Sequence, residues 1–376
     1  MIFVAQTKEG GEIVFKDRKR YLWIASILSP GVPGVCALLL LSGQSLLWAA
    51  FPLFFYFIVI PILDMLVGED INNPPEEVVE ELSNDTYYRI LLHLSVPVFF
   101  FTFFTVAYAV GTLSLPVWAF VLMTLSAGVA SGSGLTVGHE LGHKHDKLDR
   151  LSAKLINALT GYGHFNIEHN QGHHVKVATP DDPASSRFNE SIYRFAFREI
   201  PYTAVRGWEL EKRRLNQKGF SFWHWQNDVL QGYAITLVIG IALIAAFGWI
   251  MLPFLMLHHV VGWLQLTGAN YIEHYGLKRD LKENGRYAPC EPRHSWNTNH
   301  IVSNLMLFHL QRHSDHHANP MRPYQSLRNF EDLPRLPSGY PGCFGLAYLP
   351  PLWFKVMNPK VLDWADGDMS KVNTGV

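Results

Sequence analysis

The sequence predicts an all-α integral membrane protein, with six transmembrane helices and a cytoplasmic cap that is rich in histidine. Two observations support this class. The 376-residue chain has three long stretches without Asp, Glu, Lys or Arg, at 21–63, 90–138 and 229–271. Most of its 18 histidines lie in the polar segments outside those stretches. Helices of soluble proteins need a polar face, so uncharged stretches of this length indicate a membrane interior.

Each uncharged stretch is long enough to hold two membrane spans joined by a short turn. A span needs about 17–25 residues to cross about 30 Å of hydrocarbon. The predicted spans are residues 21–43, 45–67, 88–110, 115–138, 229–247 and 249–270.

Lysine and arginine predict the orientation of these spans. All 31 of them lie outside the turns at 42–45, 111–114 and 247–249. Because cytoplasmic loops carry the excess of Lys and Arg, the remaining polar segments and both termini are expected on the cytoplasmic side. The Pro- and Gly-rich tail after about residue 320 is expected to be extended coil. The predicted organisation is an N-terminal cytoplasmic segment 1–20, spans within 21–138, a first cap segment 139–228, spans within 229–270 and a second cap segment 271–376.

The overall composition excludes several classes of function. The 31 basic residues nearly balance the 32 acidic ones, so charge does not indicate a nucleic-acid partner. The three cysteines, Cys36, Cys290 and Cys343, form no CxxC pair. The sequence therefore predicts neither a disulfide framework nor a cysteine-bound metal centre of its own.

Nine histidines have spacings that suit metal binding. On a helix, residues three or four apart share one face, and three clusters in this chain have that spacing. One metal takes at most about six ligands, so nine imidazoles indicate two metals, for which Fe, Zn, Cu and Ni are suitable. The nine are His139, His143, His169, His173, His174, His274, His313, His316 and His317.

The expected place of this site is the boundary between membrane and cytosol. The fourth span begins near Leu115, and a helix of about 30 residues from there is roughly 45 Å long, so His139 and His143 emerge past its cytoplasmic end. His274 lies four residues beyond the sixth span. Ligating histidines usually donate their other N–H to a carboxylate or carbonyl, although acidic residues near them can also be solvated charges or helix caps. The candidate carboxylates are Glu140, Glu168, Asp182, Glu273 and Asp315.

Four motifs in this order resemble those of the AlkB-type membrane alkane monooxygenases, which are relatives of membrane fatty-acid desaturases and hydroxylases. They are HELGHK (139–144), EHNQGHHVKVATPDDPAS (168–185), NYIEHYGL (270–277) and LQRHSDHHANP (310–320). The resemblance implies that the cap holds a non-heme di-iron site bound by the nine histidines. It also implies O2-dependent hydroxylation of medium-chain n-alkanes to 1-alkanols in the bacterial cytoplasmic (inner) membrane. The family takes electrons from rubredoxin, which is reduced by rubredoxin reductase and NADH. Since this chain has no cysteine pair, the donor is expected to be another protein or a fused domain.

An alkane has no polar group, so its binding must come from burial, at about 0.8 kcal/mol per CH₂. We therefore expect a narrow apolar channel among the spans. Lipid-facing packing is the alternative role for any one aromatic. The candidate lining residues are Phe54, Phe55, Tyr56, Phe57, Phe103, Phe104, His258 and His259.

Three other functions fit parts of the pattern. HELGH matches the H-E-x-x-H motif of zinc proteases, with Glu140 as the general base, but the other clustered histidines have no purpose there. An aryl-methyl (xylene-type) hydroxylase, or a fatty-acyl hydroxylase or desaturase, would use the same metal site on another substrate. A transporter of heme or metal is a third class. Among the basic residues near the motifs, Lys144, Lys176 and Arg312 either bind an acidic donor protein or mark the inner membrane face.

Overall fold

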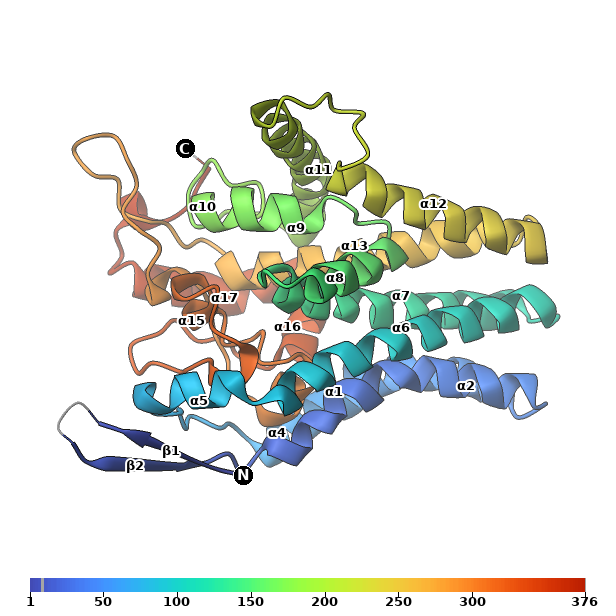
Figure 1. Cartoon of the computed structure of the whole chain (residues 1–376), viewed down its shortest axis with the longest axis horizontal. Helices are drawn as coiled ribbons and strands as arrows, with labels where there is room; N and C mark the ends of the chain where they lie inside the picture. The colour runs from blue at the N-terminus through green and yellow to red at the C-terminus, as the bar shows by residue number, and fades with distance from the viewer. Residues whose placement is uncertain (8–9, 376) are drawn as a thin grey trace.

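The computed structural model describes residues 1–7 and 10–375, and it is mostly helical. Figure 1 shows the long helices lying side by side along the long axis of the molecule. The short helices and loops gather at one end, and both termini lie toward that end. We call it the histidine end, because α7 (Val117–Gly142) and α13 (Met251–His274) both finish there with histidines.

Within the described residues, four helical stretches are long and apolar enough to cross a membrane. The longest, α6, has 27 residues and is therefore about 40 Å long. Most of the residues of α6 are apolar, and from Ile90 onward it has no Asp, Glu, Lys or Arg, so little favours exposing either face to water. The four are Arg20–Leu41, which ends in α2 (Val32–Leu41), α6 (Thr86–Thr112), α7 and α12 (Asp228–Phe247).

The two other predicted spans are also helical, but one is shorter than these four and the other is less apolar. The stretch Phe51–Val67 is a shorter apolar helix made of α3 (Phe51–Phe54), a π-helical turn at Phe55–Val59 and α4 (Ile60–Val67). Helix α13 has 24 residues, yet it includes polar side chains such as His258 and Gln265. Helix composition in the described chain therefore supports four spans, and the number six stays a prediction.

Helices α7 and α13 pack closely, and this contact brings the histidine clusters to the same level. A Cβ atom added to Gly132 of α7 would lie 2.6 Å from Cβ of Gln265 on α13. One added to Gly128 would lie 2.7 Å from Cβ of Val261. Glycine at these two positions is what allows the two backbones to approach.

The histidine end corrects two expectations. The chain is not purely helical, because β1 (Ile2–Gln6) and β2 (Glu12–Lys16) form an antiparallel hairpin that buries Phe3 and Ala5. The tail is not extended coil either. Proline occupies the first turn of both of its longer helices, where the missing N–H costs nothing. Those helices are α16 (Tyr340–Ala347) and α17 (Pro350–Trp364).

Other helices, all short except the 26-residue α11, complete the fold. They are α5 (Val79–Asn84), α8 (Lys147–Leu159), α9 (Phe165–Glu168), a π-helical turn (His169–His173), α10 (His174–Lys176), α11 (Ile192–Gln217), α14 (Ile301–Met306) and α15 (His313–Ala318).

Candidate metal centre

The structure brings all nine predicted histidines together at the histidine end, in two groups. Within each group, one nitrogen from every ring lies within 4.8 Å of the corresponding nitrogens of the others. Eight of the nine side chains are buried, and His174 is half-buried. The five-histidine group is His139, His143, His169, His174 and His316, and the four-histidine group is His173, His274, His313 and His317.

The cluster His169, His173 and His174 is divided between the two groups, and it contains a π-helical turn. His169 and His173 are four residues apart, a spacing that on a regular helix places both on one face. The chain from His169 to His173 is π-helical instead, with i→i+5 hydrogen bonds, so His174, five residues on, also comes round to the side of His169. As a result His169 and His174 join the five-histidine group, whereas His173 joins the four-histidine group.

Helix α15 is also shared between the groups. His313 and His317, one turn apart, both belong to the four-histidine group, and their rings lie 4.4 Å apart between centroids. His316 belongs to the five-histidine group. The two groups are therefore neighbours held by common elements.

Several donor atoms of the two groups either have no hydrogen-bond partner or face another imidazole nitrogen. The Nε2 atoms of His139, His143, His173 and His274 are buried without a hydrogen-bond partner. In the five-histidine group, Nε2 of His174 lies 3.0 Å from Nε2 of His169 and 3.1 Å from Nε2 of His316. Buried nitrogens without a partner are costly, so their convergence indicates a ligand shared among them.

The charge state of the imidazoles suits a metal. Burial, followed by the neighbouring imidazoles, holds the pKa of His169, His174 and His316 well below its ordinary value. The same causes lower the pKa of His313 and His317. These rings are therefore neutral, which is the form that binds metals. The residues fit a pair of imidazole-bound metal ions.

A series of charged side chains linked by hydrogen bonds holds the His173 ring in place. Its Nδ1–H donates to Oδ2 of Asp182 at 2.9 Å, which leaves Nε2 free to bind a metal. Arg206 of α11 donates to the other oxygen of Asp182 at 2.8 Å and also to Glu168. Burial alone would raise the pKa of Asp182, but His173 and Arg206 lower it below its ordinary value. Arg206 lies outside the histidine motifs, and spacing alone gave no signal for it.

The five candidate carboxylates have different partners. Asp182 contacts a histidine, and so does Glu273, whose Oε2 lies 3.1 Å from Nε2 of His313 while its Oε1 accepts from the Tyr340 hydroxyl at 2.6 Å. Glu168 reaches His173 only through Arg206 and Asp182.

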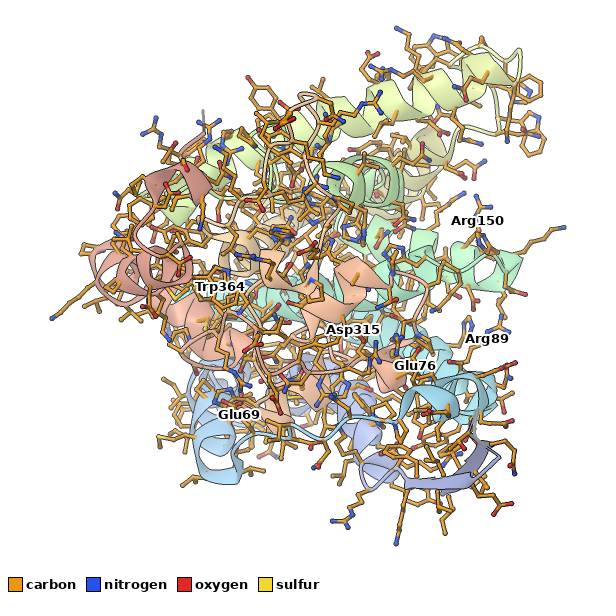
Figure 2. The ribbon with its side chains drawn as sticks, turned by 90° about the vertical axis from the view of Figure 1, so that its left-hand side faces the viewer. Glu69, Glu76, Arg89, Arg150, Asp315 and Trp364 are labelled. Carbon is orange, nitrogen blue, oxygen red and sulfur yellow. The ribbon has the colours of Figure 1, made fainter. Side chains whose placement is uncertain are left out.

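Among the described residues, the remaining two carboxylates make no hydrogen bond or ion pair with a histidine of either group. Glu140 pairs with Lys144 at 3.0 Å. Asp315 accepts from the backbone N–H of Arg328 at 2.8 Å and from Asn319 at 2.8 Å. Asp315 and its neighbour Glu76 lie on the face shown in Figure 2, where Arg322 and Arg328 both pair with Glu76.

An apolar cavity reaches both histidine groups. His139 and His169 of the five-histidine group line it, together with His313 of the four-histidine group. The rest of its lining is mostly apolar, and much of it comes from α7, α9, α13, α14, α16 and the apolar helix Phe51–Val67. These residues include Phe57, Val129, Leu135, Phe165, Leu266, Ala269, Met306, Leu307, Leu310, Pro341 and Phe344.

Two of the eight predicted channel residues, Tyr56 and Phe57, line this cavity. The others lie elsewhere. Phe54 and Phe104 are exposed on the outside of the helices, at 51% and 42%. Phe55 stacks on Phe51, and Phe103 is buried against Phe254 and His258. His258 hydrogen-bonds Ser131 at 2.9 Å, and His259 donates to the Leu255 carbonyl at 2.6 Å.

A second, polar cleft lies beside the five-histidine group. His143 and Gly142 line it from the end of α7. Five basic side chains surround it, with Asp228 as the single carboxylate in its lining. The basic residues are Lys144, Lys147, Arg150, Lys154 and Arg214. Two other basic residues that could bind an electron-donor protein already have partners. Lys176 is paired with Asp181, and Arg312 is buried and donates to the carbonyls of Asp70 and Leu327.

The sequence is similar to known proteins over nearly its whole length. A family model described as fatty acid desaturase matches residues 116–346. Alkane 1-monooxygenase 1 of Alcanivorax borkumensis is 50% identical over 95% of this chain and 89% of its own length. Alkane 1-monooxygenase of Pseudomonas putida is 51% identical with the same coverage. The xylene/toluene monooxygenase hydroxylase component XylM of Pseudomonas putida is 29% identical over 61% of each chain. The chain therefore belongs to the alkane 1-monooxygenase family, a branch of the proteins that the fatty acid desaturase model describes.

Proposed function

We propose that this integral membrane enzyme hydroxylates the terminal carbon of medium-chain n-alkanes to 1-alkanols at a non-heme di-iron centre. The observation that carries the proposal is the apolar cavity lined by His139 and His169 of one histidine group and His313 of the other. A substrate buried in that cavity would lie against both metal positions.

The nine histidines would hold two irons. A bound iron pair would supply the reductive activation of O2, which zinc cannot supply because it has no redox chemistry. The balanced reaction takes an alkane, O2, two electrons and two protons to an alcohol and water. The side chains of the protein bind the substrate, exclude water and orient the metal ligands. The apolar lining binds a hydrocarbon by burial and excludes water. The Asp182 carboxylate orients His173, and the π-helical turn at His169–His173 brings His174 to the side of His169.

The electrons are proposed to come from rubredoxin, reduced by rubredoxin reductase with NADH. None of the three cysteines in this chain forms a pair, so they cannot build such a carrier here.

The test is a reconstituted assay with iron-loaded protein in lipid, rubredoxin, reductase and NADH. We expect 1-alkanol from a series of n-alkanes, with less product from xylene and from a fatty acyl substrate. A preparation that holds iron and forms no 1-alkanol would contradict the proposal. Faster turnover of xylene would favour the activity in the name of XylM, which matches 61% of this chain.

We also propose six spans in the bacterial inner membrane, with the histidine end and both termini in the cytoplasm. The absence of Lys and Arg from the turns at 42–45, 111–114 and 247–249 supports this orientation. Cysteines introduced at Gln44, Ser114 and Gly248 should react with an impermeant thiol reagent from the periplasm. Labelling of any of the three only after the inner membrane is opened would contradict the topology.

A further inference from the structure

The five-histidine group lies between two openings of opposite character. On one side, His139 and His169 line the apolar cavity. On the other side, His143 lines the polar cleft between α7, α8, α9 and the start of α12. All members of the four-histidine group are buried, and none of them lines the cleft. An electron-donor protein in water can therefore come closer to the five-histidine group than to the four-histidine group.

The charge of the cleft defines what fits it. Three of its basic side chains share Asp228: Lys154 at 2.7 Å, Arg150 at 3.5 Å and Arg214 at 3.7 Å. Arg214 also pairs with Glu211 at 2.6 Å, and Lys144 pairs with Glu140. Asp228 is therefore the remaining carboxylate in the lining for Lys147, Arg150 and Lys154, and the cleft keeps a positive charge. The rim is open to a large partner, because the Arg150 side chain is 60% exposed. Figure 2 shows Arg150 reaching outward at one side of the histidine end.

Resting on the proposed function, we infer that this cleft is the docking surface for an acidic one-electron carrier protein, and that electrons enter through the five-histidine group. Lys147 and Arg150 form the outer rim that meets the acidic face of the carrier. His143 lies at the inner end. Each docking event oxidises the carrier by one electron, so two events supply the two electrons of one turnover. Opposite charges on two such faces speed the encounter and fix its register.

The experiment compares charge reversals on the two sides of the histidine end. The test variant is Lys147→Glu with Arg150→Glu. The control is Arg335→Glu, which removes a cation of similar exposure whose partner is Glu69, 3.5 Å away. Glu69 and Arg150 lie on opposite sides of this face in Figure 2. Both variants are made in the full chain, and iron content is measured first to confirm that the metal site is intact.

Binding of rubredoxin is then measured directly, with stopped-flow electron transfer as a second readout. We expect the double variant to raise the Kd for rubredoxin at least ~10-fold at low salt and to lose most of the salt dependence seen in the parent chain. The Arg335→Glu variant should bind as the parent does. Equal affinities in the double variant and the control would overturn the docking site. A parent chain that accepts no electrons from rubredoxin would instead overturn the proposed function.

Discussion

The two histidine groups use the same side chain in different surroundings. The five-histidine group borders the basic cleft, and its His174 is the one half-buried imidazole of the nine. The four-histidine group is fully buried and is flanked by carboxylates: Asp182 holds His173, and Glu273 lies against His313. Of the two proposed metal positions, the one in the five-histidine group is therefore closer to a partner in water. The one in the four-histidine group is held more rigidly by neighbouring carboxylates.

Removing a histidine of the four-histidine group should give the largest effect and separate the groups most clearly. In His274→Ala, we expect the metal of that group to be lost and the other to remain. Loss of a hydrogen-bond partner of a metal ligand typically lowers activity by up to ~100-fold. Loss of the ligand itself should lower product formation by more than that. Metal analysis beside an alkanol assay checks this. Loss of both metals to the same extent would show that the groups form a single site.

Removing the carboxylate behind His173 should have an intermediate effect. Asp182→Asn keeps the size of the side chain but weakens its hold on the Nδ1–H of His173 and on Arg206. Metal affinity or activity should fall ~10–100-fold. Glu168→Gln, which reaches His173 only through Arg206, serves as the matched variant and should fall less. If the two variants behave alike, the charge of the cluster matters and the direct contact to His173 does not.

Enlarging the cavity should give the smallest effect, expressed as a shift in substrate preference. Phe57→Ala opens space in the lining, so longer alkanes should gain relative to shorter ones. Each extra buried CH₂ contributes about 0.8 kcal/mol, or about four-fold in relative kcat/KM.

The matched control for the cavity is Phe54→Ala, because Phe54 lies in the same apolar helix but is 51% exposed. Its product profile across an alkane series should equal that of the parent chain. A chain-length shift in Phe54→Ala, with none in Phe57→Ala, would place the substrate elsewhere.

Spacing predicted which histidines gather, but not how they divide. On a regular helix His174 would face away from His169, and the π-helical turn is what brings these two rings into one group. The channel was harder to predict, because the stretch Phe54–Phe57 is apolar on every side and its sequence does not indicate which face is enclosed. The hairpin β1–β2 and helix α17 depend on tertiary contacts, which override local patterns rich in charge or proline. Arg206 could not be found because its carboxylate partners lie 24 and 38 residues away in the chain.

X-ray absorption and metal analysis of the iron-loaded protein test the central claim most directly. We predict about two irons per chain, each bound mainly by imidazole nitrogen. A single zinc per chain, or iron surrounded mainly by oxygen or sulfur, would contradict it.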